Sequence, residues 1–343
     1  MPSIPPPVRS RLWLMGCALG ALIVPWAVVH AGKPIHEHLS VDPQGSIEIV
    51  TVAGQVELTG WDRPEIDVTG TAGDGVERID VTTSGTHSSI HVVSRSGLTW
   101  GGGSEASLIV HVPAKSAISV SAVSADLLLK GLQGDVTLQT VSGDVSGEVG
   151  GDLHANTVSG DVRLATPAAN RIEVKTVSGD LRLSGGGGEV EITTISGDMK
   201  LDLKSLKRGR FKSVSGDLTA GFAFAADGQI EAESVSGTLT FNFATAPGAD
   251  FDVQSFSGDI SNCFGPKPVE SRYGPGSRLT FKNGGGRVHI ETKSGDVRLC
   301  AGDSRGGHST SLAPGPECRP GAAAPAGASV VASRKVARIF PLL

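Results

Sequence analysis

The sequence is poor in aromatic residues and carries no excess of positive charge. Phe, Trp and Tyr together make up 4% of the 343 residues, with a single tyrosine. So few bulky rings fit a thin core between closely spaced strands. The net charge of −5 provides no basic surface for a nucleic acid, so we expect no nucleic-acid partner.

Glycine, in contrast, is abundant, and much of it lies in one repeated motif. The chain has 47 glycines, about twice the usual share, which suits tight β-turns. Ser-Gly-Asp occurs at 142–144, 159–161, 178–180, 196–198, 215–217, 257–259 and 294–296. Variant copies are Ser-Ala-Asp at 124–126, Ser-Gly-Thr at 236–238 and Val52-Ala53-Gly54-Gln55-Val56. A near-fixed period of about twenty residues is typical of a repeat architecture.

The residues around each copy alternate between apolar and polar. Ile172 and Val174 precede one copy, and Leu181 and Leu183 follow it. Alternation with period two, interrupted by Ser-Gly, indicates strand, turn, strand. A single unit is too small to bury its apolar face, so the units must stack. The sequence therefore predicts an all-β, single-domain β-solenoid with coils of about 18–21 residues and strands about 4.8 Å apart.

The turn aspartates are the weak candidates for a metal site. Stacked like charges repel each other, and turn hydrogen bonds, solvent or a bound cation can offset that repulsion. The candidates for calcium are Asp144, Asp161, Asp180, Asp198 and Asp217. One carboxylate per coil supplies few of the six or more oxygens that calcium takes, so we expect no cofactor, with calcium as the alternative.

The N-terminus is typical of an export signal. Arg9 and Arg11 precede the apolar run of residues 12–29, and Val29-His30-Ala31 is a small-residue cleavage site. Two alternatives stay open, an uncleaved membrane anchor and a lipidated Cys17. Export would place the protein in the periplasm or at the cell surface, where only the N-terminal segment, if uncleaved, would contact the membrane.

The chain is predicted to have four parts. They are the signal or anchor at 1–31, an irregular β start or cap at 32–115, the repeat solenoid at 116–300 with an inserted loop at 264–278, and a disordered tail rich in Gly, Ala and Pro at 301–343.

An oxidising compartment would allow a disulfide. Cys263 and Cys300 each lie seven residues after the start of their motif copies. Stacking of those copies as adjacent coils would bring their Cα atoms to roughly 5 Å, within disulfide range. We predict a Cys263–Cys300 bond, which leaves Cys318 unpaired in the tail.

Two further groups of residues stand out. Lys204, Lys207, Arg208, Arg210 and Lys212 form either a solvated loop or a contact patch for anionic envelope polymers or lipid head groups. The later coils contain six phenylalanines that we expect to fill a wider core. They are Phe222, Phe224, Phe241, Phe243, Phe251 and Phe256.

The combination resembles the putative-adhesin family of bacterial envelope proteins of unknown function. The resemblance rests on the opening at 54–62 (GQVELTGWD), the strand Leu108 to Pro113 that ends in Val-Pro, and the copies from Thr140 onward, and it covers roughly 40–300. It implies a β-solenoid at the cell envelope. Gln55, Thr238, Lys293 and the 264–278 insertion depart from the family's pattern.

The leading functional hypothesis is a non-catalytic envelope or surface module that presents a β-solenoid face to a polysaccharide or protein partner of unknown identity. One alternative is a calcium-stabilised solenoid. The other is a polysaccharide-acting enzyme of the β-helix type, which needs grouped carboxylates. We expect no His, Lys or Arg to recur beside the turn aspartates as a base or charge stabiliser, and this disfavours the enzyme.

Overall fold

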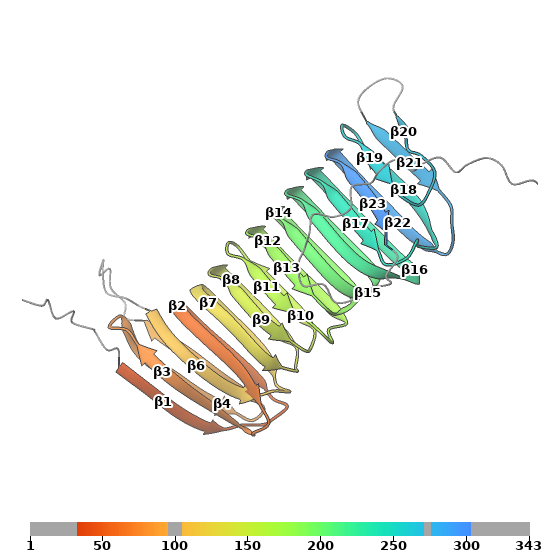
Figure 1. Cartoon of the computed structure of the whole chain (residues 1–343). Helices are drawn as coiled ribbons and strands as arrows, with labels where there is room; N and C mark the ends of the chain where they lie inside the picture. The colour runs from red at the N-terminus through yellow and green to blue at the C-terminus, as the bar shows by residue number, and fades with distance from the viewer. Residues whose placement is uncertain (1–32, 95–104, 271–275, 303–343) are drawn as a thin grey trace, which may run out of the picture.

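The computed structural model describes residues 33–94, 105–270 and 276–302. Within these residues the chain forms twenty-three strands and no helix, and no helix there is long and apolar enough to span a membrane. The strands stack side by side into one elongated body that runs from β1 at one end to β20 at the other (Figure 1). The predicted all-β, solenoid-like stack is confirmed. The predicted part boundaries stay predictions, and residues 1–31 and Cys318 lie outside the described residues.

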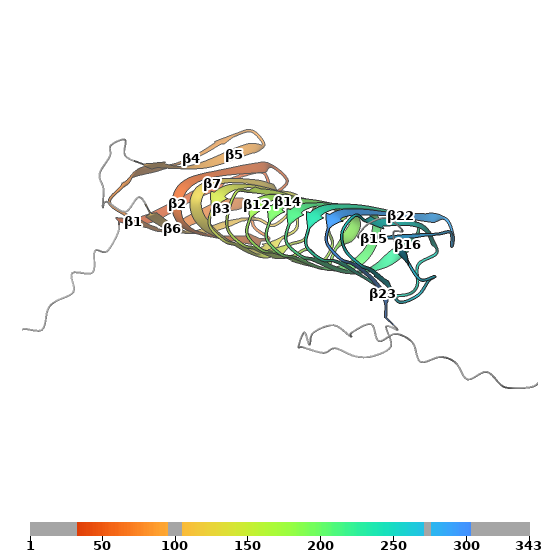
Figure 2. The same ribbon diagram turned by 90° about the horizontal axis from the view of Figure 1, so that it is seen from above.

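The middle of the stack repeats one coil. Its strands are β8 (Val136–Ser142), β9 (Val145–Val149), β10 (Leu153–Thr157), β11 (Val162–Ala165), β12 (Arg171–Ser178), β13 (Leu181–Ser184) and β14 (Gly187–Ser196). Each strand pairs in parallel with the equivalent strand of the coils before and after it, so Leu153 lies between Val136 and Ile172. Strands that precede the Ser-Gly-Asp turn form one ladder, the leading ladder, and strands that follow it form the trailing ladder. Viewed from above, the coils are flattened loops around a narrow interior (Figure 2).

The alternation in the sequence sorts side chains between that interior and solvent. In β12 the residues Ile172, Val174 and Thr176 are buried, whereas Arg171 and Lys175, on the other face of the strand, are exposed. Complete burial of one Ile or Leu side chain stabilises the fold by about 1.5–3 kcal/mol. Repetition over the coils joins these side chains into one continuous core cluster along the stack.

The Ser-Gly-Asp turn requires glycine for two reasons. Gly160 has a φ of 114°, in a region that side chains rarely adopt. A Cβ on Gly160 would lie closer than 3 Å to the carbonyl oxygen of Gly143 in the preceding coil. The same pair of constraints recurs at Gly179, Gly197 and Gly216, so the turns stack backbone against backbone.

At the N-terminal end the strands do not stack in the order in which they occur in the chain. The strands are β1 (Lys33–Ser40), β2 (Ser46–Trp61), β3 (Glu65–Ala72), β4 (Val76–Ser84), β5 (His87–Ser94), β6 (Glu105–Pro113) and β7 (Ala117–Leu132). Although β2 comes early in the chain, it lies between β6 and β7 and is parallel to both (Figure 1). Outside this coil, β3 pairs antiparallel with β6, β1 with β3, and β4 with β5.

The C-terminal end shows the same exchange. Its strands are β15 (Met199–Ser215), β16 (Leu218–Ser236), β17 (Leu239–Phe243), β18 (Ala249–Ser255), β19 (Ile260–Asn262), β20 (Val269–Glu270), β21 (Ser277–Phe281), β22 (Gly286–Ser294) and β23 (Val297–Ala301). The last strands of the chain, β22 and β23, insert between the coil of β16–β17 and the coil of β18–β19. Within the predicted loop at 264–278, β20 and the start of β21 form an antiparallel pair, and β21 also covers β18.

Aromatic side chains widen the core at this end. Phe241, Phe243 and Phe251 are buried, and Phe251 stacks on Phe281 with ring centroids 4.6 Å apart. Phe222 is also buried, and Phe224 is partly buried against the core. The prediction for Phe256 is wrong, because its ring is 78% exposed. Phe256 directly follows an inward-pointing residue of its strand, so it points outward.

Candidate functional site

A row of exposed aliphatic side chains runs along the leading ladder, beside the Ser-Gly-Asp turns. We call it the valine row, and it consists of Val52, Val123, Val141, Val158, Val177, Ile195, Val214 and Val235. These side chains are between 37% and 50% exposed, and they make up eight of the eleven large hydrophobic residues that the described structure exposes. Single exposed apolar residues are common on protein surfaces, but a contiguous set usually marks a contact surface.

The register of the strands holds the valine row straight. Thr176 pairs with Thr194 and Ser178 with Ser196, so Val177 lies beside Ile195 in the next coil. The same register continues from β2 to β16, at a spacing of about 4.8 Å. The next two positions along the stack are held by Lys293 and then Phe256. Ten positions at this spacing extend over roughly 43 Å.

A buried hydroxyl residue precedes seven of the eight members of the valine row, all except Val123, and explains why these side chains face outward. Thr140, Thr157 and Thr176 are buried, and each donates a hydrogen bond from Oγ1 to the backbone carbonyl two residues later, at 3.1–3.3 Å. Because successive side chains of a strand alternate between faces, the residue after each threonine must point to solvent.

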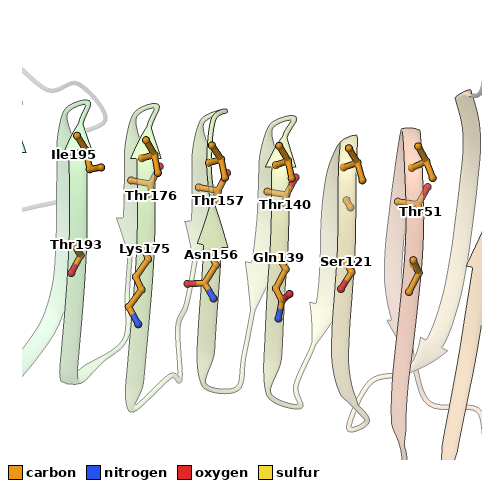
Figure 3. Close-up of a pocket in the computed structure, with 17 residues that line it drawn as sticks. Thr51, Ser121, Gln139, Thr140, Asn156, Thr157, Lys175, Thr176, Thr193 and Ile195 are labelled. Carbon is orange, nitrogen blue, oxygen red and sulfur yellow. The ribbon is translucent and has the colours of Figure 1, made fainter.

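A second row of side chains, two residues before the first, borders it. This companion row consists of Val50, Ser121, Gln139, Asn156, Lys175, Thr193, Lys212, Glu233, Glu291 and Gln254 in spatial order. Figure 3 shows Ser121, Gln139, Asn156, Lys175 and Thr193 in one line across neighbouring strands. A mostly apolar groove of about 670 Å³ lies along the two rows from Val50 to Ile195, and a second of about 500 Å³ continues from Thr193 to Lys293.

All charged residues of the companion row lie beyond its first four members. Its members up to Asn156 carry no charge, whereas Lys175, Lys212, Glu233 and Glu291 follow. Lys175 Nζ lies 2.7 Å from Glu173 Oε1, and this hydrogen bond is the main reason that the pKa of Glu173 is lowered. Lys212 Nζ lies 3.1 Å from Glu233 Oε2.

The turn aspartates form a hydrogen-bond ladder between coils. Oδ1 of Asp144 accepts the backbone N–H of Asp161, and Oδ1 of Asp161 accepts that of Asp180, both at 2.9 Å. The ladder begins at Asp126 and continues through Asp198 and Asp217 to the N–H of Thr238. It resumes where Oδ1 of Asp296 accepts the N–H of Asp259. The recurring aspartate therefore supplies an acceptor for a backbone N–H of the next coil.

Basic residues also lie beside three of these aspartates, against the expectation from the sequence, and Arg163 is 3.9 Å from the carboxylate of Asp144. Arg163 forms an ion pair with Asp161, and Arg182 with Asp180. The hydrogen bond from the Asp180 N–H, followed by the contact with Arg163, lowers the pKa of Asp161. These arginines neutralise part of the repulsion between stacked carboxylates.

The geometry provides no metal cluster within the described chain. No group of three or more His, Cys, Asp or Glu side chains in residues 33–94, 105–270 and 276–302 is arranged to hold an ion. In each of the five calcium candidates, Asp144, Asp161, Asp180, Asp198 and Asp217, one carboxylate oxygen already accepts a backbone N–H.

The predicted basic patch lies on β15, which is a strand and not a loop. Arg208 pairs with Glu189 at 2.9 Å, Arg210 with Glu231 at 3.1 Å, and Lys212 with Glu233. Lys204 Nζ donates to the carbonyl of Pro167 at 2.7 Å, and Lys207 is exposed. Carboxylates of neighbouring coils therefore balance most of this positive charge, so an anionic polymer or head group would have to compete with them.

The two predicted disulfide partners lie next to each other. Strands β19 and β23 pair in parallel, and the Cys263 N–H donates to the Leu299 carbonyl at 3.0 Å. The Sγ atoms of Cys263 and Cys300 are 3.3 Å apart, and burial raises the pKa of the Cys300 thiol. The adjacency on which the prediction rests is present, and the bond itself stays a prediction.

A comparison with known protein families agrees with this architecture. The family model for Toastrack DUF4097 matches residues 45–300. The chain belongs to the Toastrack DUF4097 family. The match confirms the family resemblance identified from the sequence. No curated protein matches the chain.

Several solved structures are similar to this Toastrack protein. A putative adhesin from Bacteroides fragilis NCTC 9343 is 12% identical, with 78% of this chain and 97% of that chain covered and a TM-score of 0.42. A putative adhesin from Parabacteroides distasonis ATCC 8503 is 14% identical, with 78% and 97% covered and a TM-score of 0.38. A putative lipid binding protein from the same strain is 13% identical, with 79% and 94% covered and a TM-score of 0.26.

Sequence reasoning identified the repeat but missed the valine row. The signal was present, because six copies carry Val or Ile between the buried hydroxyl residue and the serine. The alternation in the sequence predicts a strand at this residue but does not say which face of the strand it takes. Its exposure follows from the alternation once the preceding threonine is placed in the core.

Proposed function

We propose that this protein is a non-catalytic, exported envelope protein that contacts a partner, a polysaccharide or another protein, through the valine row. The observation that carries the proposal is the continuous exposure of eight aliphatic side chains over a rigid ladder of strands. Water is released when such a row is covered, and the rigid scaffold loses little conformational entropy on binding.

The arrangement of polar groups supports a binding role over an enzymatic one. The turn aspartates accept hydrogen bonds from the backbone N–H groups of the next coil. The ion pairs on the leading ladder link one coil to the next. Binding surfaces need complementary shape and satisfied polar groups, whereas hydrolysis of a glycan needs two carboxylates across one bond.

Retention on envelope fractions tests the proposal. The full chain is incubated with isolated envelope polysaccharide, peptidoglycan and envelope protein, with calcium and with a chelator. Val158→Glu places a charge in the valine row. Ile109→Glu is the matched control, because Ile109 is 42% exposed and lies on the trailing ladder.

We expect retention of the wild type in both conditions, at least tenfold weaker retention of Val158→Glu, and unchanged retention of Ile109→Glu. Equal retention of all three chains contradicts the proposal. Retention that disappears with the chelator supports the calcium-stabilised alternative. Cell fractionation of the tagged full chain tests export separately, and recovery in the cytoplasm contradicts it.

A further inference from the structure

The valine row has a fixed period, and that restricts what can cover all of it. Its side chains recur at the strand spacing of about 4.8 Å and point in one direction from a straight ladder. A partner that contacts every position must present apolar groups at the same period. A parallel stack of strands has this period by construction, and rows of identical side chains at this spacing interdigitate well.

The charges of the companion row indicate which parallel stack of strands could cover the valine row. If two copies of this chain meet face to face along their valine rows, with the rows antiparallel, a two-fold axis brings the two companion rows opposite each other. An alignment with Ile195 opposite Val214 of the second copy then places Lys175 opposite Glu233 and Thr193 opposite Lys212. It also places Asn156 opposite Glu291 and Gln139 opposite Gln254.

This alignment places Lys175 of each copy opposite Glu233 of the other, in addition to their partners Glu173 and Lys212 within one copy, and brings no like charges of the companion row together. A shift by one coil in one direction puts Lys175 opposite Lys212, and a shift in the other direction puts Lys212 opposite itself. Opposed like charges at an interface are strongly unfavourable. The order of charges is therefore self-complementary in this antiparallel alignment.

The contact in this alignment has the size of a weak, specific interface. Six members of the valine row, from Val141 to Val235, overlap together with the next two positions, Lys293 and Phe256, over a length of roughly 34 Å. Lys293 then lies opposite Val158 of the second copy. With the companion row included, the two copies bury on the order of 1,000 Å² in total, near the lower limit for specific interfaces. Phe256, which is 78% exposed, packs against Val141 of the second copy. Interfaces near this lower limit are typical of weak, transient complexes, so we expect a dissociation constant in the micromolar range.

We propose that the partner of the valine row is a second copy of this chain, bound antiparallel through the valine row and the companion row. This inference rests on the proposed function, because it names the partner of the same surface. The protein then self-associates, either between neighbouring copies on one cell or between copies on two cells.

Sedimentation equilibrium of the full chain, as processed by an exporting host, tests the proposal from about 1 to 200 µM, the range set by the predicted affinity. We expect a monomer–dimer equilibrium in the wild type. Val177→Glu, which faces Val235 of the second copy, should weaken the dimer at least tenfold. Ile109→Glu, with the same 42% exposure on the trailing ladder, should leave it unchanged. A monomer at all concentrations overturns the proposal, as does an equal effect of the two variants.

Charge reversal tests the antiparallel alignment itself. Lys175→Glu and Glu233→Lys should each weaken the dimer several-fold, because each places like charges opposite each other. The double variant should regain most of the wild-type affinity, whereas a surface that merely attracts apolar groups would show no recovery. A double variant as weak as the two single variants overturns the proposed alignment.

The two proposals fail in different measurements. If the wild type is monomeric but Val158→Glu loses retention on an envelope polymer, the second-copy proposal is wrong and the proposed function stands. If the wild type neither dimerises nor is retained by any fraction, both are wrong.

Discussion

The coils from β8 to β14 follow one another in chain order, whereas at both ends of the stack that order is exchanged. In the middle, every strand has a parallel neighbour on each side, and the same turn recurs in each coil. At the N-terminal end an early strand, β2, is enclosed by the later β6 and β7. At the C-terminal end the last coil of the chain, β22 and β23, lies between the two coils that precede it in the sequence.

The ends differ because they must stop the stacking. An uncovered parallel coil presents free N–H and C=O groups to which a further strand can pair. Antiparallel strands cover these positions, with β3 and β1 at one end and β21 at the other. β1 contains Lys33, His36, Glu37 and His38 and is mostly exposed, which is typical of an edge strand that resists further pairing.

The repeated residues of this chain encode continuation of the stack, and departures from the repeat encode its limits. Gly160 and Asp161 contact the equivalent residues of neighbouring coils. Where the motif lacks its aspartate, at Thr238, the next coil in space is the exchanged one that carries Asp296. Substitutions in the middle and at the ends should therefore have different effects.

The largest expected effect comes from the glycine of a middle turn. Gly160→Ala places a Cβ within 3 Å of a backbone carbonyl and also strains a φ of 114°, so we expect a loss of about 4 kcal/mol or more in the free energy of unfolding. Gly85→Ala is the matched variant at an end, since Gly85 has a φ of 64° but no neighbour within 4 Å. It should lose about 1 kcal/mol. Urea unfolding measures the free energy of unfolding of both variants. Losses of similar size would show that a turn in the middle of the stack is no more constrained than a turn at its end.

Removal of one rung of the aspartate ladder should have a moderate effect. Asp161→Ala leaves the Asp180 N–H without its acceptor and removes the contact with Arg163, so we expect a loss of about 1–2 kcal/mol. Asp259 lies at the outer end of the ladder, where no described backbone N–H reaches its carboxylate. Asp259→Ala should therefore change the stability by less than about 0.5 kcal/mol. Losses of equal size would show that the inter-coil bond contributes little.

Completion of the ladder should have a smaller, opposite effect. Thr238→Asp adds a carboxylate next to the backbone of Asp296 and so joins the middle ladder to the exchanged coil. We expect a gain of up to about 1 kcal/mol, reduced by repulsion from Asp217 and Asp296. Thr240→Asp, on the outward face of the following strand, is the control. A loss of stability in Thr238→Asp alone would indicate that charge repulsion outweighs the new hydrogen bond.

The smallest expected effect is on the pH dependence. The pKa of Asp161 is lower in the folded state than in the unfolded state, so its contribution to stability is present above the unfolded pKa and is lost as the pH falls through the folded value. Asp161→Asn keeps an acceptor oxygen but does not titrate. Between pH 5 and pH 2 the wild type should lose slightly more stability than this variant. If thermal melting shows an equal loss of stability in the wild type and in Asp161→Asn across that range, the lowered pKa of Asp161 is contradicted.

Much of the fold could be predicted from the sequence because its determinants are local. The alternation around Ile172 and Leu181 assigned strands and their inward residues, and Ser-Gly-Asp assigned the turn that requires a positive φ at Gly160. The spacing of the motif copies also placed Cys263 beside Cys300. Each inference needs only neighbours in the chain and the rule that equivalent residues stack.

The functional surface was harder to predict because solvent exposure is a property of the assembled stack. A valine beside a threonine is an ordinary strand pattern, and either residue can face the core. The hydroxyl of Thr157 turns inward because it bonds the carbonyl of Ser159 at the turn, and Val158 is thereby exposed. The contact partner of each aspartate was also hidden, because it lies in another coil.

The sequence by itself therefore determined the period, the strands, the glycine turns and the family. Only the tertiary structure decided the order of the coils at the two ends, the use of each aspartate by its neighbour and the exposure of the valine row. The physical reason is that copies of one motif are nearly equivalent stacking partners. The sequence shows that they stack but not which copy lies on which, and the antiparallel strands and aromatic core at the ends settle that order.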